Sequence, residues 1–181
     1  LGVRSNIMDY PSRDDALNAL KKKEVDIVVD ASGKSFPLQS DIIFSNRFIS
    51  DHPVLVHRKL SPGETFTYRP GMQLAIARWY VDDAWIEQNF PGARIMHFDT
   101  DDQAMASVAL HNNDFFIGNL VTSSYLLDRN YTNHLEFQSV YPERDTGFRF
   151  LFHKDESELQ RIVNSALSAI PLTQSQVILQ Q

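Results

Sequence analysis

The sequence predicts a two-lobed α/β fold, and three observations lead to it. Segments with apolar residues at the helical period alternate along the chain with short apolar runs that are typical of strands. One strand–helix–strand pattern occurs twice in the same register without a gap. One extended segment leads out of the first copy and another leads back after the second, as a hinge between two lobes requires.

The first copy of the pattern runs from Ile7 to Gly33. Ser12 starts a partial capping box in which Asp15 takes the place of the usual Glu or Gln. A helical apolar stripe follows, formed by Ala16, Leu17, Ala19 and Leu20. The β-branched run Val25–Val29 then predicts a short, buried, parallel strand, which ends in the loop Asp30–Gly33.

The second copy runs from Ile95 to Asn119, with a complete capping box at Thr100–Gln103 and a strand at Asp114–Ile117. Its register matches the first copy, because the same number of positions separates Asp14 from Asp102, Asp26 from Asp114, and Ile7-Met8 from Ile95-Met96. Two copies are too few for a solenoid, so they indicate two similar α/β lobes. The alternative is that any two strand–helix–strand units look alike.

The remaining elements are predicted from local patterns. Extended segments or strands are expected at Val54–His57, Leu74–Ala77 and Phe148–Phe152, with turns at Ser61–Gly63 and Arg69–Gly71. Helices are expected at Asp82–Phe90, which Pro91-Gly92 ends, at Glu156–Ile170 and at Thr173–Gln181. The Glu156–Ile170 helix has an apolar stripe of Leu159, Ile162, Val163, Ala166, Leu167 and Ile170.

Composition excludes several classes of function. The chain has 181 residues, 43% hydrophobic and 22% charged, which is enough for a buried core. A net charge of -6 without a basic stripe argues against a nucleic-acid partner. The absence of cysteine excludes disulfides, thiol catalysis and cysteine-based zinc sites. The six histidines lack metal-binding spacing, so no metal site is expected. No cofactor is expected either.

The order of motifs resembles the bacterial extracellular solute-binding proteins of the polar amino-acid type. In the first half, the matching segments are Ala16-Leu17, Val25–Val29, Phe44–Phe48 and Pro53–His57. In the second half they are Phe90–Ala93, Asp99–Ala104 and Phe148–Lys154. Within that family, the chain is most similar to the periplasmic flytrap domains of Bvg/Evg-type sensor histidine kinases, through Ser123–Leu126 and Glu158–Pro171.

This resemblance implies a type II periplasmic-binding-protein fold, the Venus flytrap. Lobe one is expected to comprise residues 1–53 and 154–181, and lobe two residues 54–153, with hinge strands near 54–57 and 148–153. The family opens with a strand, a helix and a second strand before the region that Leu1 matches. We therefore expect lobe one to be truncated at its N-terminus. Because the chain begins at Leu1 without an initiator Met, we also expect it to be a fragment of a longer protein.

Ligand-binding candidates lie at the predicted strand ends, where flytrap proteins hold their ligands. They are Asp30, Ser32 and Lys34 on the first loop, Arg78, Trp79 and Tyr80 before a helix, and Asn119 on the second loop. Trp79 has the alternative role of packing inside its lobe.

The resemblance also locates the anchors of an amino-acid ligand in that family. The position of its carboxylate-binding Arg falls on or near Leu38, and its ammonium-binding Asp aligns with Asn119. Lys34 or Arg47 would be a replacement cation for the missing Arg. Both departures favour a ligand other than an amino acid, or a sensor held by conformation alone.

The predicted function is a periplasmic ligand-sensing domain of an inner-membrane sensor histidine kinase, with a small-molecule ligand and a possible homodimer. The first alternative is a solute-binding subunit of an ABC transporter. An enzyme on the same fold and a scaffold without a ligand are further alternatives. No G-x-S-x-G, phosphate loop or Cys nucleophile is present, so no catalytic residue is expected. His57 and His153 end the two hinge strands, which suggests a pH-sensitive hinge as a hypothesis.

Overall fold

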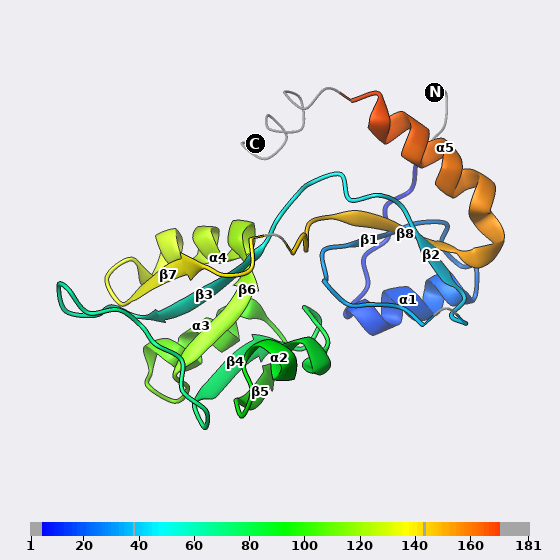
Figure 1. Cartoon of the computed structure of the whole chain (residues 1–181). Coiled ribbons are helices and arrows are strands. Elements are labelled where there is room, and N and C mark those ends of the chain that lie inside the picture. The colour runs from blue at the N-terminus through cyan, green and yellow to red at the C-terminus, as the bar shows by residue number, and fades with distance from the viewer. Residues whose placement is uncertain (1–4, 38, 143, 171–181) are drawn as a thin grey trace. The chain divides into compact units, whose positions relative to one another are not determined.

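The computed structural model describes residues 5–37, 39–142 and 144–170 (Figure 1). Leu38 and the expected helix Thr173–Gln181 therefore lie outside the described residues. The chain divides into two compact units. Unit 1 draws on Leu1–Asp30, Phe36–Asn46 and Arg149–Gln181, and unit 2 on Ala31–Ser35 and Arg47–Phe148. The divisions thus fall after residues 46 and 148, and the segment Ala31–Ser35 groups with unit 2.

Unit 1 contains a three-stranded antiparallel sheet with the order β1-β8-β2, formed by β1 (Val28–Asp30), β8 (Arg149–His153) and β2 (Ile42–Phe44). The prediction of a buried parallel strand at Val25–Val29 is wrong. The strand is shorter, it pairs antiparallel with β8, and Val29 is 57% exposed. The physical reason is that its hydrogen-bonded partner is the returning strand, and an antiparallel sheet tolerates water on one face.

The helix α1 (Arg13–Lys21) covers the sheet of unit 1. Its predicted cap is confirmed, since the Ser12 hydroxyl accepts the N–H of Asp15 at 3.1 Å. Leu17 and Leu20 pack with the sheet residues Ile42 and Leu151. Residues 5–10, by contrast, contain no strand, so the first copy lacks the strand that the second copy has at Ile95-Met96.

The C-terminal helix of unit 1 is α5 (Ser157–Ser168), which follows the short 3-10 turn η2 (Lys154–Glu156). The predicted helix at Glu156–Ile170 is thereby confirmed. Its apolar stripe does not reach a core, because none of the helix residues is buried and Ile162 is 54% exposed.

Unit 2 contains a five-stranded mixed sheet with the order β5-β4-β6-β3-β7 (Figure 1). The strands are β3 (Pro53–Arg58), β4 (Gln73–Ala77), β5 (Arg94–Phe98), β6 (Phe115–Asn119) and β7 (Leu135–Ser139). β4 pairs in parallel with β5 and β6, whereas β3 pairs antiparallel with β6 and β7. All strands predicted in this region are confirmed, and the sequence pattern missed one further strand, β7.

Helices cover both faces of the unit 2 sheet. They are α2 (Asp83–Asn89), α3 (Asp101–Ala109) and α4 (Leu120–Leu126), which continues as the π-helical turn η1 (Leu127–Tyr131). The predicted cap of α3 is confirmed, because the Thr100 hydroxyl accepts the N–H of Gln103 at 3.2 Å. The predicted turns are present as well, with Gly63 and Gly71 at positive φ.

The core of unit 2 lies on both sides of its sheet. One cluster packs alternate strand residues such as Val54, Val56 and Phe116 against α3 and α4. The other packs the intervening residues, such as Leu55 and Ile117, against α2 and the loops beside it. Burial of both faces explains why these strands read as continuous apolar runs.

Among the described residues, none of the helices combines the length and the apolar character that crossing a membrane requires.

Candidate ligand-binding site

The carboxyl ends of two parallel neighbouring strands bring predicted site residues together in unit 2. Tyr80 follows β4 and Asn119 ends β6, and both are almost completely buried. Ligands of α/β sheets commonly bind at this edge. We call Tyr80, Asn119, Thr146 and Asp82 the strand-end site.

A chain of buried hydrogen bonds connects three residues of the strand-end site. The Thr146 hydroxyl donates to Asn119 Oδ1 at 2.7 Å, and the Tyr80 hydroxyl lies 2.9 Å from the same Thr146 oxygen. Because Thr146 has a single hydroxyl proton, Tyr80 is the donor in the second bond. Burial raises the pKa of Tyr80, so its hydroxyl keeps this proton at any physiological pH.

The loop segment Ala31–Ser35, which follows β1 in the chain, lies against the strand-end site. The N–H of Gly33 donates to the Tyr80 carbonyl oxygen at 2.6 Å. The Gly33 carbonyl oxygen in turn accepts a bond from Arg144 Nη2 at 2.7 Å. The segment therefore binds the site through its main chain.

Both ends of the loop segment are also bonded to the site. Asn119 Nδ2 donates to the Ala31 carbonyl oxygen at 3.1 Å. Asp82 Oδ2 accepts the N–H of Ser35 at 3.0 Å and its hydroxyl at 2.8 Å. Asn119 thus uses both its donor and its acceptor within unit 2, and it offers no charge to an ammonium group.

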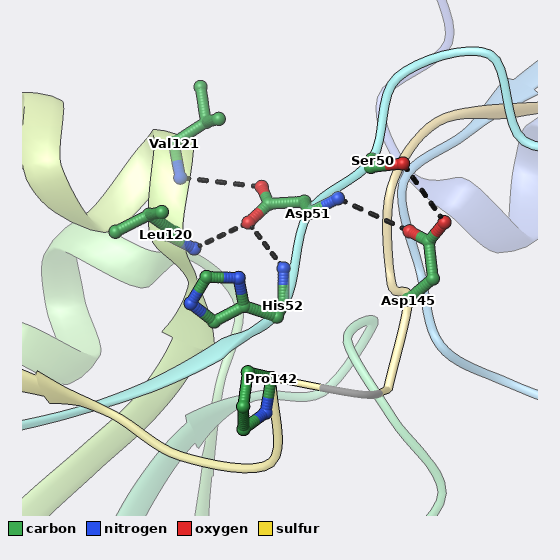
Figure 2. Close-up of a pocket in the computed structure, with 7 residues that line it drawn as sticks. All are labelled: Ser50, Asp51, His52, Leu120, Val121, Pro142 and Asp145. Atoms are coloured by element: carbon green, nitrogen blue, oxygen red, sulfur yellow. Dashed lines mark hydrogen bonds between the residues drawn. The ribbon is translucent and has the colours of Figure 1, made fainter.

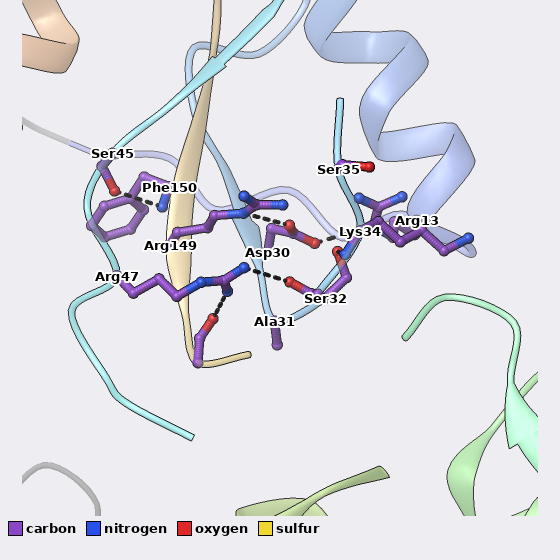
Figure 3. Close-up of polar contacts among 12 residues, drawn as sticks. Arg13, Asp30, Ala31, Ser32, Lys34, Ser35, Ser45, Arg47, Arg149 and Phe150 are labelled. Carbon is purple, nitrogen blue, oxygen red and sulfur yellow. Dashed lines mark hydrogen bonds and ion pairs between the residues drawn. The ribbon is translucent and has the colours of Figure 1, made fainter. Parts of the chain in front are cut away.

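The other predicted residues of the loop region serve the main chain (Figure 3). Arg47 donates to the carbonyl oxygens of Ser32, at 3.1 Å, and of Gly147. The hydroxyl of the buried Ser32 accepts the N–H of Lys34 at 3.3 Å. Arg47 therefore connects the main chain at Ser32 with the main chain at Gly147, and its guanidinium donates to protein carbonyl oxygens.

Arg78 and Trp79 are not brought into the strand-end site by any hydrogen bond of the described residues. Arg78 is largely exposed and pairs with the exposed Asp99 at 2.8 Å. Trp79 is partly buried against a core cluster and stacks edge-on with Tyr80 at 5.7 Å between ring centroids. This geometry agrees with the packing alternative for Trp79.

Asp30 lies in a separate cluster in unit 1 (Figure 3). Its carboxylate accepts Arg13 Nε at 3.1 Å on one oxygen and Arg149 Nε at 3.0 Å on the other. The Arg149 guanidinium lies over the Phe44 ring at 4.7 Å and the Phe36 ring at 5.2 Å. Two guanidinium groups thus surround one buried carboxylate.

Sequence reasoning missed Arg13 and Arg149. A signal for Arg149 was present, because it interrupts an aromatic strand pattern, and a buried arginine there requires a carboxylate. Thr146 and Arg144 were missed as well. They lie in a loop whose sequence shows no pattern that would identify them.

A polar cavity of about 290 Å³ lies elsewhere in unit 2, lined in part by Ser50, Asp51, His52 and Asp145 (Figure 2). The buried Asp51 carboxylate accepts the main-chain N–H groups of His52 at 2.7 Å, Leu120 at 2.9 Å and Val121 at 3.3 Å. Burial raises the pKa of Asp51, while these N–H groups act in the opposite direction. The first N–H groups of α4 are therefore capped by the protein's own carboxylate.

The histidines of the hinge hypothesis are buried. The His57 ring stacks on Phe66 at 5.0 Å, and its Nδ1 lies 2.7 Å from the Arg58 carbonyl oxygen. His153 accepts the N–H of Asp155 at 3.1 Å. Within the described ranges, no group of three or more acidic or histidine side chains is placed to hold a metal ion.

Comparison with known proteins identifies relatives among bacterial sensor proteins. The virulence sensor protein BvgS of Bordetella bronchiseptica is 32% identical over 178 residues, which cover 96% of this chain. The sensor protein EvgS of Escherichia coli O157:H7 is 30% identical over 170 residues, which cover 94% of it. The chain spans 14% of the length of each of these relatives. No protein-family model matches it.

Solved structures share the fold. The periplasmic domain of BvgS from Bordetella pertussis matches with a TM-score of 0.75 at 28% identity, over 94% of this chain and 33% of that one. A putative ABC-transporter binding component from Wolinella succinogenes, solved with lysine, matches with a TM-score of 0.76 at 19% identity. That match covers 98% of this chain and 77% of the other, and at this identity it shows the fold alone.

Proposed function

We propose that this chain, a homologue of the sensor proteins BvgS and EvgS with a Venus-flytrap fold, is the periplasmic ligand-sensing domain of a membrane-bound sensor histidine kinase. The observation that carries this proposal is sequence identity of 32% with BvgS along 96% of the chain. The domain itself performs no chemistry. It senses by a change between open and closed lobes, and a ligand shifts that equilibrium only by its differential affinity for the two states.

The strand-end site supports a ligand other than a free amino acid. A carboxylate at the position of Asn119 would attract an ammonium group, whereas the amide present there is neutral and already bonded on both sides. The one carboxylate of the site, Asp82, lies at the start of α2 and accepts two bonds from Ser35. We therefore place any ligand of this domain among small molecules that offer hydrogen-bond donors rather than a full α-amino-acid head group.

The second candidate function is the solute-binding subunit of an ABC transporter. The likeness to the lysine-bound protein from Wolinella succinogenes favours it, although this likeness concerns the fold alone. The two candidates differ in the polypeptide that carries the domain. A sensor domain is tethered to the inner membrane, and a transport subunit is released with the periplasmic contents.

Cell fractionation distinguishes the two functions. An antibody against this chain is used to probe membranes and the osmotic-shock fluid of the source bacterium. The sensor function predicts a membrane-bound polypeptide several times heavier than the 20.7 kDa of this chain. A released polypeptide of roughly the size of a single flytrap protein would support the transport function instead. The cytoplasmic fraction serves as the control for leakage.

A thermal-shift screen tests whether a ligand binds at all. A panel of small amides, polyols, amino acids and small organic acids is tested near neutral pH. A ligand at a concentration of 100 times its Kd adds about 2.7 kcal/mol to the free energy of unfolding, which is a readily measured shift. Asn119→Ala is the site variant, and Arg78→Ala, which alters an exposed ion pair, is the matched control. A compound that stabilises the wild type and Arg78→Ala but not Asn119→Ala binds at the strand-end site.

A further inference from the structure

We infer that the loop segment Ala31–Ser35 is a built-in occupant of the strand-end site, and that a ligand reaches Tyr80 and Asn119 only by displacing it. The inference rests on the proposed sensing function and concerns the regulation of the same site. It places an internal competitor where an external ligand is expected.

The segment satisfies the site's polar groups along its whole length. Three main-chain groups and one hydroxyl of the segment bond to Tyr80, Asn119 and Asp82. Arg144 binds the segment as well, since it donates to the Gly33 carbonyl oxygen. Its guanidinium lies 5.0 Å from the centroid of the Trp85 ring. A site in this state has few free donors or acceptors for another molecule.

The segment also fits the site closely in shape. A Cβ atom added to Gly33 would lie 2.8 Å from Thr146 Cγ2 and 2.9 Å from Val81 Cγ1. Gly33 does not have a positive φ, so its main-chain conformation is open to other residues. Glycine is required at this position for space alone, because the main chain lies directly on the site.

The bonds of the segment define the chemistry that a competing molecule needs. A molecule that replaces the segment has to present a donor to the Tyr80 carbonyl oxygen and an acceptor to Arg144. A second donor, an amine or a hydroxyl, takes the place of Ser35 opposite Asp82. The site thus selects a small amide- or hydroxyl-bearing molecule that imitates a stretch of main chain.

Hydrogen exchange at single amides tests whether the segment is seated. Gly33→Ala introduces the clash, and Val81→Ala/Thr146→Ser removes both methyl groups that the new Cβ would meet while keeping the Thr146 hydroxyl function. Four proteins are compared: wild type, Gly33→Ala, the Val81→Ala/Thr146→Ser background, and the triple variant. The β6 amides report whether each protein is folded.

If the segment occupies the strand-end site, the amide of residue 33 should exchange at least about tenfold faster in Gly33→Ala than in the wild type. In the Val81→Ala/Thr146→Ser background, the same substitution changes the rate by less than about twofold. Tryptophan emission changes with the first substitution too, because Arg144 leaves its place above Trp85. A wild-type Gly33 amide that exchanges at the rate of an unstructured peptide overturns the inference.

A second variant covers the case in which Gly33→Ala does not fold. Asp82→Ala removes the acceptor of both Ser35 bonds without adding bulk, and Asp82 makes no capping bond to α2. It is expected to speed exchange at the Ser35 amide at least about tenfold and leave the β6 amides protected. Unchanged exchange at Ser35 would contradict the inference.

Displacement is tested with the members of the thermal-shift panel. Any compound of the panel that stabilises the wild type through Asn119 has to speed exchange at the Gly33 amide. A compound that stabilises through Asn119 while Gly33 stays protected refutes displacement. If the segment is seated and no compound of the panel binds, ligand sensing gains no support while the occupancy of the site stands, so the two results remain distinguishable.

Discussion

The carboxyl group of Asp101 provides a sharp test of the electrostatics of unit 2. Asp101 is the first residue of α3 and is only 8% exposed. Its Oδ1 has no hydrogen-bond partner among the described residues. The start of a helix favours a carboxylate, but burial has the larger effect and raises the pKa of Asp101 to about 6 from its ordinary 3.8.

This pKa predicts a pH-dependent loss of stability. As the pH rises, the unfolded chain releases the Asp101 proton first, so the folded state loses stability between about pH 4 and 6, and the loss is complete above that range. The difference between the two pKa values corresponds to about 3 kcal/mol at pH 7. Asp101→Asn removes the ionisation and is therefore expected to stabilise the protein at neutral pH relative to the wild type.

Urea unfolding at pH 4 and pH 7.5 measures this effect. The advantage of Asp101→Asn over the wild type should grow by about 2.4 kcal/mol between the two pH values, because Asp101 of the unfolded chain is already partly ionised at pH 4 and all other titrating groups are common to both proteins. Asp102→Asn, at the neighbouring exposed carboxylate of the same turn, is the control, and its change should stay below about 1 kcal/mol. An equal difference between Asp101→Asn and the wild type at both pH values would refute the reasoning.

Three further predictions concern stability, each measured by urea unfolding at pH 7. Asp30→Asn leaves two guanidinium groups without their shared buried carboxylate and should cost about 3–5 kcal/mol, whereas Asp41→Asn, in an exposed ion pair, should cost less than about 1 kcal/mol. Equal losses of stability in Asp30→Asn and Asp41→Asn would show that the ion pairs of Asp30 are not shielded from water. Ser12→Ala and Thr100→Ala each remove a helix cap and should each cost about 1 kcal/mol, and no loss at either position would contradict the observed cap. Gly147→Ala should abolish cooperative unfolding, since its Cβ would lie 1.6 Å from a main-chain carbonyl oxygen; a stable variant would mean that this loop has another conformation.

The elements that the sequence predicts well are those with strong local patterns. Ser12 and Thr100 occupy their expected cap positions because a hydroxyl before an apolar helical stripe competes for few other roles. The inner strands of unit 2, β3, β4 and β6, read clearly since both of their faces are buried. The short edge strand at Leu135–Ser139 was missed because most of its residues are exposed and carry no apolar pattern.

Tertiary pairing determined the parts that were not predicted. The orientation of β1 depends on its neighbour β8, which lies more than a hundred positions away in the chain, and no local pattern reports that neighbour. Tyr80 and Asn119 were predicted as site residues and do lie together at one sheet edge, bridged by Thr146. Thr146 itself was missed because it lies in a loop, and its partners Tyr80 and Asn119 are distant from it in the sequence. Leu38, on or near which the carboxylate-binding Arg of the resembling family falls, lies outside the described residues.

Phosphate transfer in membranes tests the sensing function most directly. Membrane vesicles that contain the full polypeptide carrying this domain are incubated with radioactively labelled ATP on the cytoplasmic side. The label should appear on that polypeptide, and a compound that stabilises the isolated domain should change its rate of appearance when added to the periplasmic side. A polypeptide that carries this domain and takes up no label under any of these conditions would contradict the assignment to a sensor kinase.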